Sequence, residues 1–274
     1  MKKFEVIKPY KNLKEFETLI EGYELYHTLP MEFRNDSVLY FSKEEIENNE
    51  EHFKQIGEIM PTKDLIGKIL NEDCLITMSK MEDKSVDLVL TDPPYGLDYG
   101  YDTYVDTPEN LKELISKVMP ELLRIGERVA IFTGVHNLLL YPKSNWIMCW
   151  TWNTTGSFGR MGFNQWQPIM FYGEDIKGFG SVNGELKSDV FSFSGMGSAG
   201  YSKEKGHPCG KPINVMKKLV ARLSKENDLV YDPFMGSGTT AVACKQLKRN
   251  FIGSEISKEY CEIARQRLRQ GILL

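Results

Sequence analysis

Long apolar runs, cysteine pairs and an excess of positive charge are all missing from this sequence of 274 residues. No apolar run approaches the ~20 residues that span a bilayer, and no signal-type apolar stretch follows the charged N-terminus. The five cysteines are scattered and form no Cys-x-x-Cys pair, which argues against a disulfide framework and against a zinc site. We therefore expect a cytoplasmic protein that has no metal centre and does not enter a membrane.

The sequence also contains no internal repeat and no low-complexity tract, which excludes solenoid and linker proteins. Its formal net charge is −4, so any nucleic acid would have to be bound by a local basic patch. With 41% hydrophobic and 26% charged residues, the composition is ordinary for a globular protein. At this length we expect one substantial domain with embellishments.

Strand patterns and helix patterns alternate along most of the chain. Seven segments have the length and composition of strands: residues 65–70, 86–91, 128–133, 145–150, 167–172, 228–231 and 251–255. Four segments have helical periodicity: residues 111–123, 211–223, 238–247 and 258–268. Because strands that alternate with helices form parallel sheets covered by helices, this order predicts an α/β fold.

Two regions depart from the alternation. Residues 1–62 contain a capping-box pattern at Ser42 and Glu45 and six glutamates from Glu44 to Glu58, which predicts an acidic helical extension at the N-terminus. Residues 153–205 are rich in Gly, Ser, Asn and aromatics without helical periodicity, which predicts loops inserted in the main domain. The main domain then covers residues 63–274.

An acidic turn follows the second predicted strand, where residues 86–95 read VDLVLTDPPY. In an open α/β sheet, ligands bind beyond the carboxyl ends of the strands, so Asp92 lies at the binding edge. Pro93 and Pro94 fix the backbone and keep the turn rigid. Taken alone, the motif is as consistent with an ordinary structural loop as with a site.

The turn suits one chemical task, the activation of an exocyclic amine on adenine or cytosine. The nitrogen lone pair is delocalised into the ring, and acceptors aimed at the two amino hydrogens favour a more nucleophilic geometry. The Asp92 carboxylate and the Pro93 carbonyl would be these acceptors, and Tyr95 would stack on the base. An activated methyl group could then transfer in line without a covalent intermediate, once the base has been flipped out of the duplex.

A second strand ends in a glycine-rich turn, where residues 229–240 read LVYDPFMGSGTT. Gly236 and Gly238 allow close backbone approach at a helix N-terminus. A P-loop is disfavoured because Thr239 follows Gly238 where a lysine would be required. The next strand ends at Glu255, close to the ~20-residue spacing at which an acid binds the ribose of an adenosine-containing cofactor. Glu255 could also simply cap the helix that follows it.

With these motifs the chain resembles the DNA amino-methyltransferases of the β group, in which DPPY precedes the glycine-rich motif in a circularly permuted order. The resemblance covers about residues 63–268. Asp73 and Cys74 match an Asp-Cys pair that holds the cofactor adenine in that family, and residues 207–212, HPCGKP, match its HPxxKP segment.

The resemblance implies a Rossmann-like methyltransferase fold with a mostly parallel seven-stranded sheet and one antiparallel strand. It implies S-adenosylmethionine as cofactor and Asp92, Pro93, Pro94 and Tyr95 as catalytic residues. The residues implied for cofactor binding are Asp73, Cys74, His207, Lys211, Pro212, Asp232, Pro233, Phe234, Gly236, Ser237, Gly238, Thr239 and Glu255, with Lys211 near the methionine carboxylate.

The same resemblance makes the insertion at 153–205 the target-recognition segment of a catalytic domain that acts on double-stranded DNA. Polar residues there that could contact DNA are Arg160, Asn164, Gln165, Gln167, Lys177, Lys187, Lys203 and Lys205. Its aromatic residues could stack on bases, but packing of the insertion onto the sheet explains them as well. Relatives of this arrangement are often dimeric, so a homodimer is a further expectation.

Site-specific methylation of adenine N6, as in restriction-modification systems, is the leading hypothesis, because the family associates Asp at the first motif position with adenine. Cytosine N4 is the nearest alternative. A cytosine-C5 mechanism through Cys209 is disfavoured, because amino methylation needs no thiolate and Cys209 lies inside the HPxxKP frame. A non-catalytic module that binds S-adenosylmethionine or DNA remains the alternative from another class.

Overall fold

The computed structural model describes residues 61–101, 103–152, 164–174, 188–192 and 210–270, together with short strands elsewhere whose side chains are not described. Contacts divide the chain into two compact units. The first is Met1–Asp64 with Ser79–Glu82, and the second is Leu65–Met78 with Asp83–Leu274.

The first unit contains a four-stranded sheet in the order β3-β2-β1-β4. Its strands are β1 (Lys2–Val6), β2 (Thr18–Glu21), β3 (Leu39–Phe41) and β4 (Phe53–Glu58). These strands correct the expectation that the extension is helical throughout. The helix predicted to begin near Ser42 and Glu45 lies outside the described residues and stays a prediction. The register sets Glu58 opposite Lys2 and Lys54 opposite Glu5. Pairing between such distant segments depends on the tertiary context, which a local window of sequence does not show.

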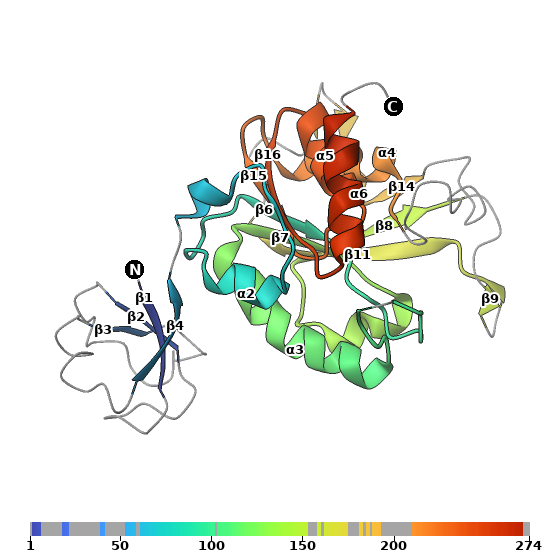
Figure 1. The fold of residues 1–274 in the computed structure, drawn as a ribbon. Coiled ribbons are helices and arrows are strands. Elements are labelled where there is room, and N and C mark those ends of the chain that lie inside the picture. Colours follow the sequence, from blue (N-terminus) through green and yellow to red (C-terminus); the bar gives the residue numbers. More distant parts are fainter. Residues whose placement is uncertain are drawn as a thin grey trace. The chain divides into compact units, whose positions relative to one another are not determined.

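The second unit is built on an eight-stranded sheet in the order β14-β8-β11-β7-β6-β15-β16-β5 (Figure 1). Its strands are β5 (Ile69–Leu70), β6 (Leu88–Thr91), β7 (Arg128–Phe132), β8 (Trp146–Thr151), β11 (Trp166–Gly173), β14 (Val190–Ser192), β15 (Leu229–Asp232) and β16 (Asn250–Ser254). Only β11 runs antiparallel to its neighbours in this sheet. The Rossmann-like α/β fold with one antiparallel strand is thus confirmed.

The sheet has one strand more than the seven expected. The additional strand is β14, which pairs in parallel with β8 at the edge of the sheet. It lies in the segment 153–205, where loops were expected apart from the predicted strand at residues 167–172. The first predicted strand, residues 65–70, is reduced to β5, and the residues before it form a 3-10 turn, η3 (Thr62–Leu65). Short two-residue strands β9, β10, β12 and β13 form two further pairs at Phe158–Gly159, Gly162–Phe163, Ser181–Val182 and Glu185–Leu186.

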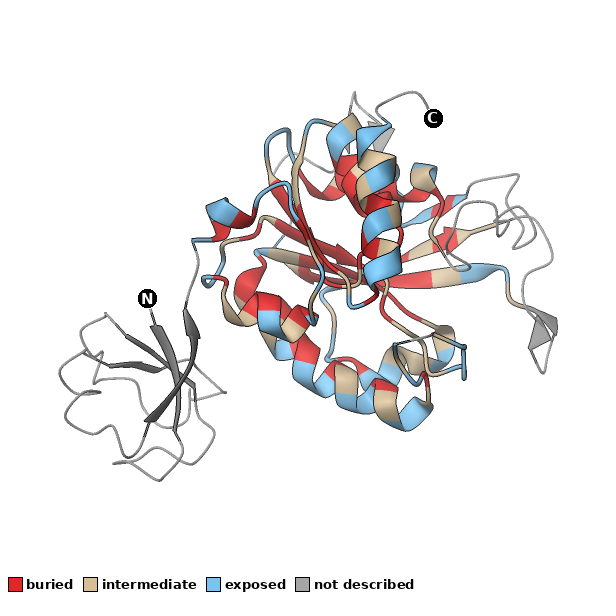
Figure 2. Cartoon of the chain, viewed as in Figure 1, coloured by how far each residue is buried: buried red, intermediate tan, exposed pale blue. Residues whose placement is uncertain are grey.

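Helices cover both faces of this sheet (Figure 1). On one face lie α4 (Ile213–Leu223), α5 (Thr239–Gln246) and α6 (Lys258–Arg269), and on the other lie α2 (Cys74–Ser79) and α3 (Pro108–Ile125). All four residues of β6 are buried, as are all four of β15 (Figure 2). A strand covered on both faces needs apolar side chains at every position, which explains why these strands read as continuous apolar runs.

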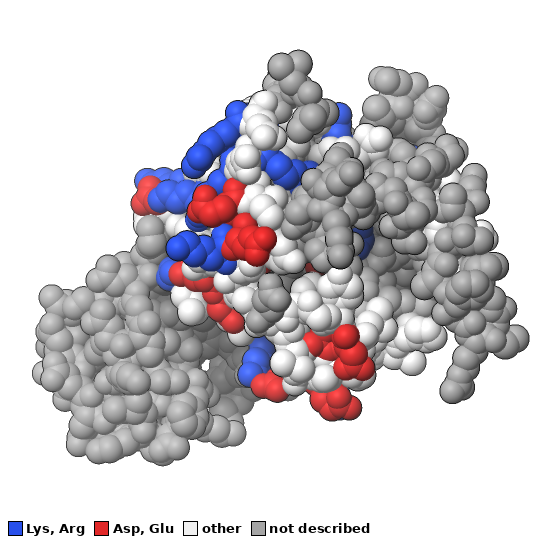
Figure 3. Space-filling model, turned by 45° about the vertical axis from the view of Figure 1, so that its right-hand side comes forward, with Lys and Arg blue, Asp and Glu red and all other residues white. Residues whose placement is uncertain are grey.

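The surface charges of the described residues are mixed in sign. On the face shown in Figure 3, Lys and Arg side chains lie among Asp and Glu side chains at the upper left, whereas Asp and Glu predominate at the lower edge. This pattern agrees with the formal net charge of −4. No helix in the described part of the chain is long and apolar enough to cross a membrane.

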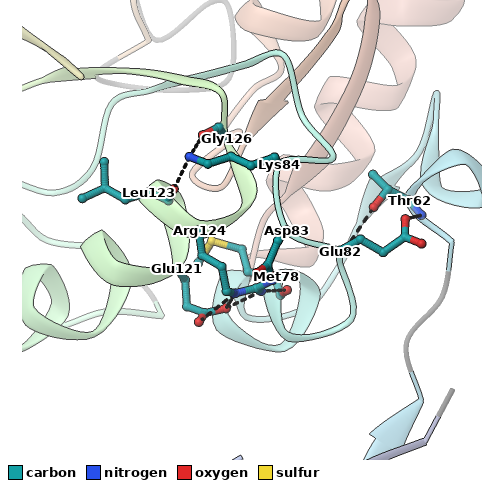
Figure 4. A network of polar contacts seen from close by, with 9 residues as sticks. All are labelled: Thr62, Met78, Glu82, Asp83, Lys84, Glu121, Leu123, Arg124 and Gly126. Atoms are coloured by element: carbon teal, nitrogen blue, oxygen red, sulfur yellow. Dashed lines mark hydrogen bonds and ion pairs between the residues drawn. The ribbon is translucent and has the colours of Figure 1, made fainter. Parts of the chain in front are cut away.

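Polar contacts fix the segment that leads into β6 (Figure 4). Arg124, near the end of α3, donates to Glu121, to Asp83 and to the carbonyl of Met78, each at 2.7 Å. The ammonium of Lys84 donates to two carbonyl oxygens at the end of α3, each at 2.8 Å. Cations that bind the last carbonyls of a helix also favour its dipole. These contacts join α2, α3 and the start of β6, which carries the candidate site at its other end.

Candidate active site

The turn after β6 brings three charged or polar groups together. Asp92 follows β6 at the carboxyl edge of the sheet, and the Tyr95 hydroxyl donates a hydrogen bond to its Oδ1. The Lys211 ammonium, just before α4, donates to Asp92 Oδ2 and lies 3.2 Å from the Tyr95 hydroxyl. The expectation that Lys211 lies near the methionine carboxylate of the cofactor stays a prediction, and its contact with Asp92 was not expected from the sequence.

Tyr95 is held at both ends. The Asn137 side chain donates to the Tyr95 carbonyl at 2.8 Å, and the Gln167 side-chain amide donates to the Tyr95 hydroxyl. Burial, followed by the neighbouring Asp92, raises the pKa of Tyr95 well above its ordinary value. The phenol therefore remains protonated at neutral pH and acts as a hydrogen-bond donor.

The loop after the turn is organised around Asp106, which is 3% exposed. Its carboxylate accepts from the backbone amides of Gly96 at 2.6 Å, Leu97 at 3.1 Å and Tyr99 at 3.3 Å. Tyr104, in the same loop, has a buried hydroxyl that finds no hydrogen-bond partner within the described part of the chain. A buried hydroxyl without a hydrogen-bond partner lowers the stability of the fold, and a bound ligand could supply the missing partner.

The glycine-rich turn connects β15 to α5 with two glycines in the left-handed region, Gly236 at φ 51° and Gly238 at φ 83°. Arg267 of α6 holds this turn from outside. It donates to the Ser237 carbonyl at 2.6 Å and to the Thr239 hydroxyl at 3.2 Å. The turn is therefore ordered before any ligand binds.

Asp232 at the end of β15 is 3% exposed and accepts three hydrogen bonds. The donors are the Thr91 hydroxyl at 2.7 Å, the Phe234 amide at 3.1 Å and the Thr240 hydroxyl. Burial raises the pKa of Asp232 to about 6, while the bonds from Thr240 and Thr91 act in the opposite direction. Asp232 thus ties the end of β6 to the start of α5.

Glu255 follows β16 and binds the backbone of two loops. Its carboxylate accepts from the Gly236 amide at 2.8 Å and from the Ser257 amide at 2.7 Å. Burial raises its pKa. Asn71 donates to the carbonyls of Glu255 and Ile256 at 3.0 and 2.9 Å. The geometry agrees with the capping alternative, and each carboxylate oxygen retains a lone pair for a ligand hydroxyl.

The predicted Asp-Cys pair lies at the start of α2. Asp73 is exposed, and its Oδ1 accepts from the Leu75 amide at 2.7 Å. Cys74 is buried, and burial together with Asp73 raises its pKa to about 12, which keeps the thiol protonated. Cys74 therefore contributes surface and shape to the site, while Asp73 contributes charge.

A single cleft collects most of these groups and encloses about 1080 Å³, including the part open to solvent. The predicted site residues that line it are Asp73, Cys74, Asp92, Pro94, Lys211, Asp232, Pro233, Phe234, Gly236, Ser237, Thr239 and Glu255. Pro93, Tyr95, Pro212 and Gly238 are not among its lining residues. Gly238 instead packs against Ala264 of α6. His207 lies outside the described residues.

Ten further residues line the cleft that were not predicted: Tyr101, Thr103, Tyr104, Leu114, Gly210, Met216, Met235, Thr240, Ile256 and Tyr260. The tyrosines of residues 95–104 are dense enough that the sequence could have signalled an aromatic wall beside the DPPY turn. Gly210, Met235 and Thr240 lie inside the two motifs quoted from the sequence, whereas Thr103, Leu114, Met216, Ile256 and Tyr260 come from loops or helices that carried no local signal.

Of the residues predicted to contact DNA, the structure describes Asn164, Gln165 and Gln167, and the Gln167 side chain donates to the Tyr95 hydroxyl. Asn164 Oδ1 accepts from the Trp166 amide at 3.4 Å, and Gln165 is exposed. Arg160, Lys177, Lys187, Lys203 and Lys205 lie outside the described residues.

Comparisons with known proteins agree with this architecture. Residues 160–266 match the family model N6_N4_Mtase, described as DNA methylase. The Type II methyltransferase M.HpaI of Haemophilus parainfluenzae is 28% identical over 235 residues, which cover 73% of this chain and 74% of the relative. M1.MboII of Moraxella bovis is 29% identical over 247 residues, which cover 71% of this chain and 94% of the relative.

Two solved structures share the fold. The complex of M1.HpyAVI with SAM is 23% identical with a TM-score of 0.52, covering 76% of this chain and 100% of that one. The cytosine-N4-specific PvuII DNA methyltransferase is 13% identical with a TM-score of 0.58, covering 76% of this chain and 88% of that one. Together with the sequence relatives, these findings support a DNA amino-methyltransferase of either adenine N6 or cytosine N4.

Proposed function

We propose that this chain is a Type II DNA methyltransferase that transfers the methyl group of S-adenosylmethionine to the N6 amino group of adenine. One observation carries the proposal: a carboxylate suited to an exocyclic amine, Asp92, shares one cleft with the glycine-rich turn and Glu255. The sequence relatives and the matched family model support the coarser activity, DNA amino-methylation.

On the substrate side, the Asp92 carboxylate and the Pro93 carbonyl accept the two amino hydrogens of the flipped base. Acceptors already fixed in the fold stabilise the positive charge that develops on nitrogen, and they need no reorganisation during the reaction. Lys211 holds the second oxygen of Asp92 and fixes the carboxylate in place. The Tyr95 ring, clamped through its carbonyl and hydroxyl, provides the face on which the base stacks.

The chemistry of the cleft fits S-adenosylmethionine. Bound there, the cofactor supplies a methyl group activated by a positively charged sulfonium. Four carboxylates line the cleft, on Asp73, Asp92, Asp232 and Glu255, and they favour a cationic ligand. Asp73 and Glu255 would hold the adenine and ribose ends, and the turn around Ser237 the methionine end. The Tyr104 hydroxyl, which has no hydrogen-bond partner among the described residues, offers one more donor to the same ligand.

Adenine rather than cytosine is proposed because the first motif position is Asp92. Cytosine N4 remains the second candidate, since the PvuII enzyme with the same fold is cytosine-N4-specific. We further propose that the segment 153–205 recognises double-stranded DNA, that the first unit is a separate N-terminal extension, and that the enzyme forms a homodimer.

Incubation of the full chain with DNA and labelled S-adenosylmethionine, followed by mass spectrometry of the nucleosides, tests the proposal. We expect N6-methyladenine from the wild type and a loss of about 10²-fold or more with Asp92→Asn, because an amine acceptor is replaced. The control Asp64→Asn makes the same chemical change at an exposed residue and should retain activity. Methylcytosine would support the second candidate, and no methylated nucleoside on varied DNA would overturn the enzyme assignment.

A further inference from the structure

Three buried hydroxyl groups lie between the sheet of the second unit and α2, and none of their residues lines the cleft. They belong to Tyr231 of β15, Ser254 of β16 and Thr77 of α2, and all three residues are fully buried. The Tyr231 and Ser254 hydroxyls are 2.8 Å apart, and the Ser254 hydroxyl donates to the Thr77 hydroxyl at 2.8 Å. The Thr77 hydroxyl donates to Glu72 Oε1, also at 2.8 Å. The hydroxyls thus form a chain that ends on the Glu72 carboxylate.

The hydrogen bonds of this chain all run in one direction. A hydroxyl has one hydrogen, and Ser254 gives its hydrogen to Thr77, so Tyr231 is the donor in its contact with Ser254. Burial raises the pKa of Tyr231 well above its ordinary value, which keeps the phenol protonated. An ionised carboxylate only accepts hydrogen bonds, so Glu72 is the terminal acceptor for three buried donors. Without a terminal acceptor a buried donor would be left unmatched, which is destabilising.

Glu72 and Asp73 are adjacent acids with different surroundings. Asp73 lines the cleft, and its Oδ1 accepts from the Leu75 amide at 2.7 Å. Glu72 is only partly exposed and is not among the lining residues. Residues 71–73 are not helical, so neighbouring side chains point to different sides, and the bond from Thr77 that holds Glu72 inside directs Asp73 toward the cleft. The hydroxyl chain therefore decides which of two chemically similar acids faces a ligand.

We propose that Thr77 and Glu72 are positioning residues, because the hydroxyl chain holds Glu72 inside the fold and thereby orients Asp73 toward the amino group of the cofactor adenine. This inference rests on the function proposed above, in which Asp73 holds the adenine end of S-adenosylmethionine. Since neither Thr77 nor Glu72 lines the cleft, both act only through the direction of the Asp73 carboxylate. Their loss should weaken recognition of the amino group specifically.

The test measures how well the full chain distinguishes an amino group from an oxygen at the same position of the purine. Calorimetry gives the Kd of S-adenosylhomocysteine and of S-inosylhomocysteine, which carries a carbonyl oxygen in place of the amino group. A carboxylate accepts from the amino group and repels the oxygen, so wild type should bind the adenosyl compound about ten-fold or more tightly. Asp73→Asn should reduce this ratio of Kd values to about two-fold or less, because an amide both donates and accepts.

Substitutions at both ends of the last bond test the positioning. Thr77→Val should lower the ratio about three-fold or more, because valine cannot hold Glu72 and the Asp73 carboxylate loses its fixed direction. Thr77→Ser should keep the wild-type ratio, because its hydroxyl restores the bond. Glu72→Leu should act like Thr77→Val without altering the buried hydroxyls, which provides a second variant if Thr77→Val does not fold. Glu72→Gln should act like wild type, because the glutamine carbonyl still accepts from Thr77.

Ser224→Ala is the matched control. It also removes a fully buried hydroxyl that takes part in hydrogen bonds, but at the end of α4, in a residue that does not line the cleft. Its ratio should equal that of wild type. Equal weakening of both compounds in Thr77→Val, with an unchanged ratio, would show a general structural role and overturn the proposal. A lowered ratio in Glu72→Gln would mean that Glu72 itself meets the adenine, which would overturn it as well.

The binding test does not depend on methyl transfer. A chain that binds S-adenosylhomocysteine but methylates no nucleoside refutes the proposed function, and the ratios still decide this inference. A wild type that binds both compounds equally well, or binds neither, overturns the inference.

Discussion

Replacement of Gly238 by alanine should destabilise the protein through one close contact between α5 and α6. Gly238 adopts φ +83°, and a Cβ built on it would lie 2.7 Å from Ala264 Cβ and 3.0 Å from Ala264 Cα. A left-handed conformation costs a non-glycine residue ~1–2 kcal/mol. Overpacking against α6 adds ~1–3 kcal/mol. We therefore expect Gly238→Ala to lower the free energy of unfolding by about 2–5 kcal/mol.

Gly67→Ala separates the two contributions. Gly67 has a similar φ of +78°, but a Cβ there would meet nothing within 4 Å. This variant should lose only the backbone cost of about 1–2 kcal/mol. Urea denaturation of both variants measures the difference, which reports the contact with Ala264. Equal losses in the two variants would refute the packing argument, whereas recovery by Ala264→Gly in the Gly238→Ala protein would support it.

Three other perturbations test the electrostatics, the helix ends and the mechanism. The pKa of Asp232 is raised to about 6 in the fold, so the folded state binds more protons than the unfolded state between about pH 4 and 6. The free energy of unfolding of wild type, relative to Asp232→Asn, should therefore fall as the pH rises through this range, which urea titrations at several pH values would measure. A flat difference would contradict the buried-acid argument. Thr107→Ala should lower the free energy of unfolding by about 1 kcal/mol, because Thr107 caps α3 by accepting from the Asn110 amide; an unchanged denaturation midpoint would be inconsistent with the cap. Cys209→Ser should retain methyl transfer in the labelled-cofactor assay, and abolished transfer would point instead to a covalent cytosine-C5 mechanism.

The second unit could be predicted from sequence in its main elements. Alternating apolar and helical patterns identified the four longest helices of the main sheet's two faces and seven of its eight strands. The signal was strong because β6 and β15 are buried on both faces, so their sequences are continuously apolar. The prediction missed β14, which has three residues, and α2, which has six, because so few residues do not show a recognisable period.

The first unit shows what a local signal cannot report. The capping box at Ser42 and Glu45 lies outside the described residues, so the helix predicted there stays a prediction, whereas Phe53–Glu58 form β4 beside β1, which the sequence did not indicate. Most of the unit's sequence lies between the two strands, and no window of local residues reports their pairing. Long-range pairing decides strand formation more often than intrinsic propensity does.

The sequence by itself determined the order of the motifs. It also identified the candidate site residues Asp92, Gly236, Gly238 and Glu255, because each was recognised by its residue type near the end of a strand. The tertiary structure alone decided which groups meet there. Lys211 lies 119 residues from Asp92 along the chain yet donates to its carboxylate, and Gln167 reaches Tyr95 because β11 runs antiparallel. Strand direction and the packing of distant segments set these contacts, and neither leaves a trace in the residues nearby.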